Sequence, residues 1–215
     1  MNKYQRIYAQ CKAVKTSFIG VVLRLIYYKV CYKITVLSSS NTYVEGMANI
    51  KSGGTLKIGL KKLGFTFKKD ATYLNIRGKL NIRGDYSIAK GCRFDIGPQG
   101  VVNIGSGGFI NANSLLIIMH KLTIGDDCSI SWNTQFLDDN FHQLEYEGKK
   151  DDKNNEIAIG NHVWIGCNCF FYKGSRIPDN CIVAANSVVK DAFYEENTLI
   201  GGNPAKVIKR NVNWK

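Results

Sequence analysis

The fold is decided by residues 159–189, which read IGNHVW IGCNCF FYKGSR IPDNCI VAANSV V. Every sixth residue of this stretch is large and apolar, namely Ile159, Ile165, Phe171, Ile177, Val183 and Val189. A period of six fits neither an amphipathic helix, at 3.6 residues, nor an alternating strand, at two, so it indicates a larger unit that repeats along the chain. We predict a coil with flat sides, in which each hexad supplies a short strand and a corner.

The position four residues after each large residue is mostly small, which indicates a narrow interior. These positions hold Val163, Cys169, Ser175, Cys181, Ser187 and Phe193. Asn161, Asn168 and Asn180 fall at predicted corners, where tight turns need the left-handed backbone conformation that asparagine tolerates. One large and one small inward side chain per side would fill a three-sided prism.

The same period continues towards the N-terminus in shorter runs of different phase. The runs cover residues 76–94, 104–116 and 118–136, with weaker traces at Val44, Ile50 and Leu56. Small insertions at corners would change the phase in this way, and the turn sequence at 97–100 is one such place. We therefore predict a single elongated all-β domain over residues 44–200.

The cysteines fit core positions better than redox or metal chemistry. The chain has seven, an odd number, and none has metal-type spacing. Four of them, Cys92, Cys128, Cys169 and Cys181, fall at the small inward position of a hexad. We expect them to be reduced core residues, which is typical of a cytoplasmic protein, and we expect no metal.

Residues 1–43 are predicted to form a basic, amphipathic helical segment. No acidic residue precedes Glu45, whereas seven lysines and arginines do. The apolar stretch 18–28 contains Arg24 and is far shorter than the ~20 residues that span a bilayer. The segment would cover the open end of the prism. Peripheral contact with anionic lipid at the inner face of the membrane is an alternative, whereas no nucleic-acid-binding module accompanies the charge.

The repeat breaks in the loop 137–158. Phe136 and Ile159 are 23 residues apart, which is not a multiple of six, and the intervening sequence is polar and charged. A loop of this composition on a solenoid indicates a site. Its His142 is one of three histidines, and a histidine can act as a general base near neutral pH, although an ordinary surface histidine is the alternative.

These features together resemble the hexapeptide-repeat acyltransferases, in particular the galactoside, maltose, capsule and lipopolysaccharide O-acetyltransferases. The resemblance rests on the hexads, on DDNFH at 138–142, on IGNHVWIG at 159–166 and on GGNPAKVI at 201–208. It implies a left-handed parallel β-helix and a homotrimer with active sites between neighbouring subunits. We expect the tail 201–215 to contain a short helix.

The resemblance also implies roles for particular residues. His142 corresponds to the catalytic base, Asn111 to an asparagine that faces the acceptor and the acetyl group, and Trp164 to a tryptophan of the catalytic cleft. The backbone N–H of Cys167 is a candidate donor to the oxyanion. A structural asparagine in a corner ladder is the alternative for Asn111, and Asp138 or Asp139 either orients His142 or belongs to a solvated loop.

Acetyl-CoA is expected along the outside of the later coils. The residues that match its channel are Gly166, Cys167, Ala184 and Ala185, and the cations available for its phosphates are Lys190, Lys206, Lys209 and Arg210. The chain departs from the family at Lys190-Asp191, where a Thr-Lys-Asp motif is shortened. It also has no early acidic residue to match the one that binds the acceptor in sugar acetyltransferases, so a galactoside or maltose acceptor is not supported.

We therefore predict an acetyl-CoA-dependent O-acetyltransferase that acts on a sugar hydroxyl, with a cell-surface polysaccharide or its precursor as the carbohydrate acceptor. Two alternatives stay open. An N-acetyltransferase for an amino-sugar nucleotide would use the same prism with a different acceptor pocket, and a non-catalytic β-helix scaffold would use the prism as structure alone.

Overall fold

The residues of the six-residue pattern form the interior of the protein. The computed structural model describes residues 2–143, 145–150 and 155–215, and in it all six large residues of the 159–189 run are at most 2% exposed. The small positions Val163, Cys169, Ser175, Cys181 and Ser187 are buried with them. The prediction of one large and one small inward side chain per side is confirmed.

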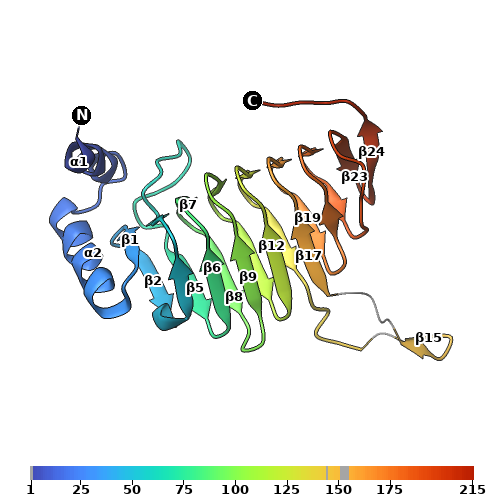
Figure 1. Ribbon diagram of the computed structural model, residues 1–215, viewed down its shortest axis with the longest axis horizontal. Helices are drawn as coiled ribbons and strands as arrows, with labels where there is room; N and C mark the ends of the chain where they lie inside the picture. Colours follow the sequence, from blue (N-terminus) through green and yellow to red (C-terminus); the bar gives the residue numbers. More distant parts are fainter. Residues whose placement is uncertain (1, 144, 151–154) are drawn as a thin grey trace.

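Three sheets, which we name A, B and C, surround this interior (Figure 1). Sheet A consists of β1 (Thr35–Ser38), β4 (Thr55–Ile58), β7 (Tyr86–Ile88), β10 (Phe109–Ile110), β13 (Ser129–Ile130), β18 (Trp164–Ile165), β21 (Ile182–Val183), β23 (Leu199–Gly202) and β24 (Ala205–Lys209). Sheet B consists of β2 (Thr42–Glu45), β5 (Thr72–Ile76), β8 (Arg93–Ile96), β11 (Leu115–Ile118), β14 (Gln135–Leu137), β19 (Phe170–Tyr172) and β22 (Val188–Val189). Sheet C consists of β3 (Ile50–Ser52), β6 (Lys79–Ile82), β9 (Val101–Ile104), β12 (Lys121–Ile124), β17 (Glu156–Ile159) and β20 (Arg176–Ile177).

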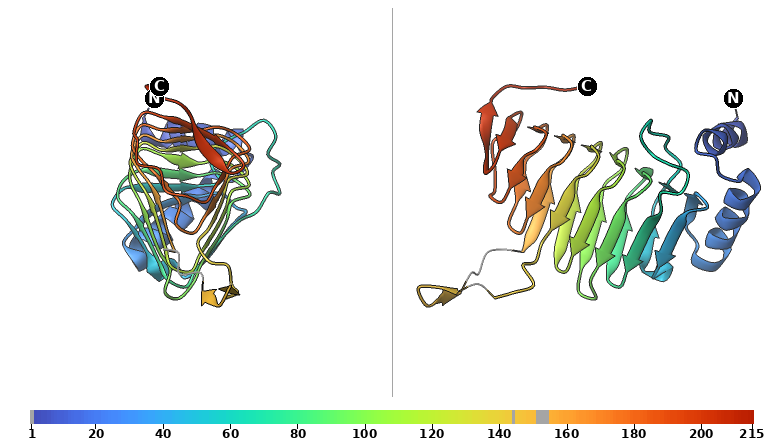
Figure 2. Two further views of the ribbon diagram at one scale, coloured as in Figure 1. Left: turned by 90° about the vertical axis from the view of Figure 1, so that its right-hand side faces the viewer. Right: turned by 180° about the vertical axis from the view of Figure 1, so that it is seen from behind.

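The chain winds as a three-sided parallel β-helix. Consecutive strands enter sheets A, B and C in turn, and strands from successive turns pair in parallel. The end-on view in Figure 2 shows the three walls, and Figure 1 shows the coils in sequence order along the long axis. A 3-10 turn, η1 (Met47–Asn49), precedes β3, and a small hairpin of β15 (Glu145–Tyr146) and β16 (Lys149–Lys150) stands apart from the prism.

The strand register explains the phase changes in the sequence. Trp164 pairs with Ile182, 18 residues further on, so this late coil holds three whole hexads. Phe109 pairs with Ser129, 20 residues further on, so this middle coil carries two additional residues. The two longest insertions are the loops 59–71 and 138–155. Corners absorb added residues because the apolar ladder resumes in the next strand.

Two helices precede the first strand, which agrees with the predicted helical segment. α1 (Lys3–Ala13) begins after Asn2, whose side chain accepts a hydrogen bond from the backbone N–H of Gln5. α2 (Phe18–Tyr32) begins after Ser17, whose hydroxyl accepts one from the N–H of Gly20. Within the described residues, neither helix is long and apolar enough to cross a membrane.

α2 covers the open end of the prism (Figures 1 and 2). It packs on β1, and with α1 it encloses a second apolar cluster that includes Val21 and Leu37. The first strand begins at Thr35, earlier than the start at residue 44 that the hexads suggest. The end of the core is thereby shielded from water.

The prediction of a short C-terminal helix is wrong. Residues 205–209 form β24, which runs antiparallel to β23. The reversal follows Gly202, whose φ of 107° is a conformation that suits glycine. β24 buries Ala205 and packs Val207 against the core, an alternation with period two that a strand satisfies and a helix does not.

Candidate active site

Five of the predicted site residues lie at corners along one edge of the prism, and Trp164 lies beside them. We name the corners that join sheet A to sheet B the A/B edge; they are 39–41, 59–71, 89–92, 111–114, 131–134, 166–169 and 184–187. Asn111, Gly166, Cys167, Ala184 and Ala185 belong to these corners. The corners stack because β10, β13, β18 and β21 are successive neighbours in sheet A.

Asn111 is held inside its corner with one polar atom unsatisfied. Its backbone N–H donates to the carbonyl of Ile130 at 2.9 Å, which fixes its position in the coil. The side chain is only 7% exposed, and its Oδ1 has no hydrogen-bond partner among the described residues. A buried polar atom without a partner is unusual in folded proteins, and a catalytic or ligand-binding role is one explanation for it.

Trp164 opens β18 and has an aromatic neighbour that the sequence did not indicate. It is 42% exposed, and the ring of Trp214 in the C-terminal tail lies 6.2 Å away. Trp214 stacks on His162 at 4.2 Å and donates its Nε1–H to the His162 carbonyl at 3.0 Å. The tail therefore returns along the prism, as Figure 1 shows, and lies beside the predicted cleft. No spacing in the sequence links residue 214 to residue 162.

The small residues of the later corners serve coil packing. A Cβ placed on Gly166 would lie 2.5 Å from the backbone N of Ala185 in the next coil, so glycine is required there by the stacking itself. Cys167 follows it and is half-buried. These corners present a nearly smooth backbone surface outside the prism.

His142 and Lys190 lie on a different edge. Both follow strands of sheet B, β14 and β22, on the side where the chain turns towards sheet C, which we name the B/C edge. After β14 the chain continues to β17 of sheet C, and after β22 Ala192 forms a bridge to Arg176 of β20. His142 is exposed in the loop 138–155, of which Leu144 and residues 151–154 lie outside the described residues. Within one chain, the predicted base is therefore not brought together with Asn111 and Trp164.

Asp138 anchors the loop that carries His142. The Asp138 side chain is fully buried, and its two carboxylate oxygens accept the backbone N–H groups of Met119 at 2.7 Å and of His120 and Lys121 at 2.8 Å. Burial raises the pKa of the Asp138 carboxyl, and the three N–H donors act in the opposite direction. The carboxylate supports the previous coil rather than His142.

Asp139 pairs with His120 at the base of the loop. Its Oδ2 lies 2.8 Å from His120 Nε2, and its Oδ1 accepts the N–H of Phe141 at 2.6 Å. The Phe141 N–H, and next the His120 ring, lower the pKa of the Asp139 carboxyl. No pattern in the sequence indicates this pair, because the link between His120 and Asp139 depends on the register between neighbouring coils.

The C-terminal cations differ in availability. Lys206 and Lys209 lie in β24 and are exposed. Arg210 follows them, and its Nε donates to the Glu195 carboxylate at 2.8 Å. Exposed pairs of this kind are weak, so Arg210 can exchange Glu195 for a more highly charged anion.

The inward cysteines are chemically quiet. Burial raises the pKa of Cys92 to about 12 and the pKa values of Cys128 and Cys169 to about 11. Thiols with such pKa values stay protonated and unreactive near neutral pH. Cys167 is the half-buried exception among the cysteines of the hexads.

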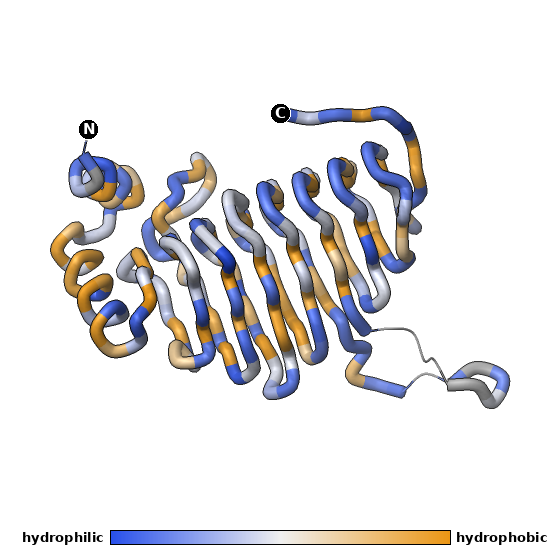
Figure 3. The backbone as a smooth tube through the Cα atoms, in the orientation of Figure 1, coloured by the Kyte–Doolittle hydropathy of each residue, from blue (hydrophilic) through white to orange (hydrophobic). Residues whose placement is uncertain are grey.

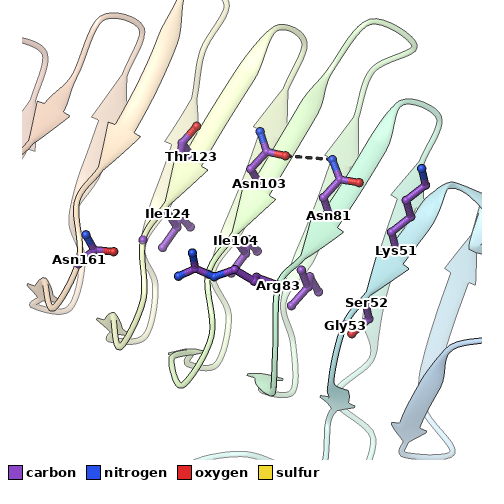
Figure 4. A pocket seen from close by; sticks show the side chains of 13 residues that line it. Lys51, Ser52, Gly53, Asn81, Arg83, Asn103, Ile104, Thr123, Ile124 and Asn161 are labelled. Atoms are coloured by element: carbon purple, nitrogen blue, oxygen red, sulfur yellow. Dashed lines mark hydrogen bonds between the residues drawn. The ribbon is translucent and has the colours of Figure 1, made fainter.

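A shallow groove of about 650 Å³ lies elsewhere, on the outer face of sheet C. Figure 4 shows Lys51, Asn81, Asn103 and Thr123 along it, with Asn81 donating to Asn103 at 2.9 Å. The residues predicted to act in catalysis and coenzyme binding do not line this groove. Its volume alone assigns it no chemistry.

Comparisons with known proteins agree with this architecture. Residues 157–191 match the family model described as bacterial transferase hexapeptide (six repeats). A Klebsiella pneumoniae protein named "Uncharacterized 24.8 kDa protein in cps region" is 36% identical over 208 residues, which cover 96% of this chain and 93% of that protein. The chain belongs to the hexapeptide-repeat transferase family.

Other hexapeptide-repeat transferases are similar over part of their length or in fold. A polysialic acid O-acetyltransferase of Escherichia coli O1:K1 is 29% identical over 66% of this chain and 44% of its own length. The crystal structure of the polysialic acid O-acetyltransferase OatWY superposes with a TM-score of 0.57 at 22% identity, over 84% of this chain and 90% of that one. The latter likeness shows a common fold.

Replacement of Asp138 by alanine should destabilise the protein. Three backbone N–H groups would lose their acceptor in a buried site, and we expect the free energy of unfolding to fall by about 3 kcal/mol. Urea denaturation measures this, with Asp191→Ala, an exposed carboxylate, as the control. A difference between the two variants of less than about 0.5 kcal/mol would contradict the anchoring role.

Proposed function

We propose that this hexapeptide-repeat transferase is an acetyl-CoA-dependent O-acetyltransferase that acts on a sugar hydroxyl of a surface polysaccharide or its precursor. The observation that supports this most is the stacking of Asn111 and Cys167 on one edge, with Trp164 beside them, in a chain with a relative named as an O-acetyltransferase. In this proposal the coils are left-handed, as the family resemblance implies.

The proposed reaction is a direct transfer. The acceptor hydroxyl oxygen attacks the thioester carbonyl carbon while a ring nitrogen of His142 takes the hydroxyl proton. The C–O ester bond forms as the C–S bond breaks, and the proton passes from His142 to the CoA thiolate. The backbone N–H of Cys167 stabilises the negative charge that develops on the carbonyl oxygen.

The site is completed by a second copy of the chain in a homotrimer. The outer face of the later strands of sheet B is mainly apolar. Its in-register positions are Leu115, Ile117, Leu137, Phe170, Tyr172 and Val188, with Gln135 between Leu115 and Phe170, whereas β8 carries Arg93 and Asp95 on the same face. The outer face of sheet C instead exposes basic residues, among them Lys51, Lys79, Lys121 and Arg176. A mainly apolar patch of this kind favours burial against another subunit.

A threefold arrangement would join the two edges. If three parallel prisms turn sheet B towards a common axis, the A/B edge of each copy faces the B/C edge of the next. His142 and Lys190 of one copy would then lie beside Asn111, Trp164 and Cys167 of its neighbour. Lys190 becomes a candidate for the coenzyme phosphates in this arrangement, together with Lys206, Lys209 and Arg210.

His142→Ala should lower kcat by about 10²- to 10⁴-fold, because the proton of the acceptor hydroxyl would have no base. The KM for acetyl-CoA should stay unchanged. Release of free CoA thiol in the presence of an acceptor glycan measures both quantities, and an acetyl group that mild alkali removes identifies an ester rather than an amide. Glu147→Ala, an exposed change in the same loop, is the control. An unchanged rate for His142→Ala would remove the histidine from the mechanism.

Mixing two inactive variants should restore activity. In trimers formed from equal amounts of His142→Ala and Asn111→Ala chains, about a quarter of the clefts would combine an intact B/C edge with an intact neighbouring A/B edge. Activity near that fraction of wild type, after the two chains are co-refolded, supports a shared site. Mixtures as inactive as either variant alone would mean that each site lies within one chain.

We also propose that the segment 1–43 rests on the cytoplasmic face of an anionic membrane. Figure 3 shows that α2 is largely apolar. Along one face of it, five apolar residues are between 52% and 72% exposed, namely Ile19, Leu23, Ile26, Tyr27 and Val30. Basic residues flank this face, and no acidic residue precedes Glu45. Positive charge around an apolar face favours anionic lipid over a second copy of the same helix, whose charges would repel.

Leu23→Glu should weaken binding to vesicles that contain phosphatidylglycerol by at least about tenfold, since it removes one inserted side chain and adds a repelled charge. Co-sedimentation measures the binding, and binding should fall as salt is raised. Tyr194→Glu, an exposed aromatic in the last coil, is the control. Equal binding of the variant and the wild type, or equal binding to neutral phosphatidylcholine vesicles, would contradict membrane contact.

A further inference from the structure

The loop 59–71 is an insertion to which the proposed reaction gives no role. It joins β4 to β5, so it leaves the prism at the A/B edge, the edge that carries Asn111 and Cys167. Figure 2 shows it standing out from the wall of the prism as a long teal loop. An insertion on the edge of a candidate site is well placed to contact the acceptor.

The loop extends along the A/B edge towards the candidate site. It starts after β4, yet Phe65 contacts Trp132, with ring centroids 5.5 Å apart in an edge-to-face arrangement. Trp132 lies in the corner between those of Asn111 and Cys167. Phe65 is 48% exposed and Trp132 is 39% exposed, so two adjoining aromatic side chains face solvent beside the site.

A lysine of the same loop contacts an aromatic ring of the strand that leads to Asn111. Lys61 Nζ lies 3.6 Å from the centroid of the Phe109 ring. Phe109 begins β10, and Asn111 is the first residue of the corner after that strand. Burial lowers the pKa of Lys61. The contact with the ring positions the ammonium, and Lys61 as a whole is half-buried.

The surrounding charge is positive. The loop also carries Lys62, Lys68 and Lys69, and its single acid, Asp70, accepts the backbone N–H of Phe67 at 2.7 Å. The other corners of the A/B edge, from 89 to 187, contain no carboxylate. An anionic ligand is therefore attracted by the loop 59–71 and meets no carboxylate in these other corners.

We propose that Phe65, Trp132 and Lys61 form an acceptor platform that selects an acidic sugar, with the aromatic rings against the C–H face of the sugar and the ammonium on its carboxylate. The proposal rests on the proposed function, because it assigns the acceptor side of that reaction. The platform lies on the N-terminal side of Trp164, whereas the coenzyme residues lie on the C-terminal side, so the two substrates approach the cleft from opposite ends.

A neutral acceptor would not need a cation at this place, whereas an acidic acceptor would. An ammonium that pairs with a carboxylate gives a charge-assisted hydrogen bond, which is about twice as strong as a neutral one. An aromatic pair supplies contact area without the entropy loss of long flexible side chains. Together they discriminate a carboxylated sugar from its neutral counterpart.

Binding of two acidic probes tests the platform without reference to catalysis. The probes are a glucuronic-acid-containing tetrasaccharide and an N-acetylneuraminic acid tetramer, each compared with its carboxyl-reduced form by saturation-transfer NMR and titration. We expect Lys61→Gln to weaken binding of the better acidic probe by about tenfold and to leave its reduced form unaffected. Phe65→Ala and Trp132→Ala should weaken both forms.

Phe67→Ala is the matched control, since Phe67 is an aromatic residue of the same loop and is 76% exposed. Its hydrogen bonds with Asp70 and Lys90 use backbone atoms, so the loss of the ring leaves them in place. It should bind like the wild type. Kinetics give a second measurement: the three platform variants should raise the KM for an acidic acceptor and leave the KM for acetyl-CoA within about twofold.

The outcomes separate the platform from the enzyme activity. The platform proposal is overturned if the wild type binds neither of the two acidic probes. It is also overturned if Lys61→Gln binds the better acidic probe as tightly as the wild type does. A change in the KM for acetyl-CoA of the same size as that for the acceptor also overturns it. If the wild type binds acidic probes through these residues but acetylates no glycan, the platform stands and the proposed function fails.

Discussion

The structure depends on the stacking of one large apolar side chain directly on its counterpart in the next coil. Phe136 and Phe171 show the contact most clearly, because their rings are parallel to within 13° at a centroid distance of 4.9 Å. The stack keeps successive strands in register, and the register lets their backbone groups pair in parallel. A coil that lost the inward residue would lose both the contact and the alignment.

This constraint confines chemistry to the outside of the prism. The interior is filled by the buried apolar side chains of successive coils. Inserted residues are tolerated only at corners, where they interrupt no ladder, and the two long insertions, 59–71 and 138–155, lie on different edges. A site that needs both edges needs two copies of the chain, which is why the apolar outer face of sheet B matters for the proposed reaction.

Two aspartates hold the loop that carries His142 on the prism. Asp138 is buried under the loop that carries His142 and bonds three backbone N–H groups of the previous coil. Asp139 pairs with His120 in the same place. The acidic residues that precede His142 in the sequence therefore hold the loop on the prism, and His142 itself is exposed.

The sequence by itself determined the interior: a period of six and alternating side-chain volume predicted the stacked coils, because inward positions recur locally along the chain. Contacts between coils were decided by the tertiary structure. It is His162, and not the predicted Asn161, that takes the left-handed conformation at its corner, and Trp214 reaches His162 although 52 residues separate them. The sharing of an edge by Phe65, Trp132 and Asn111 depends on the register between coils of unequal length, which local sequence patterns do not encode.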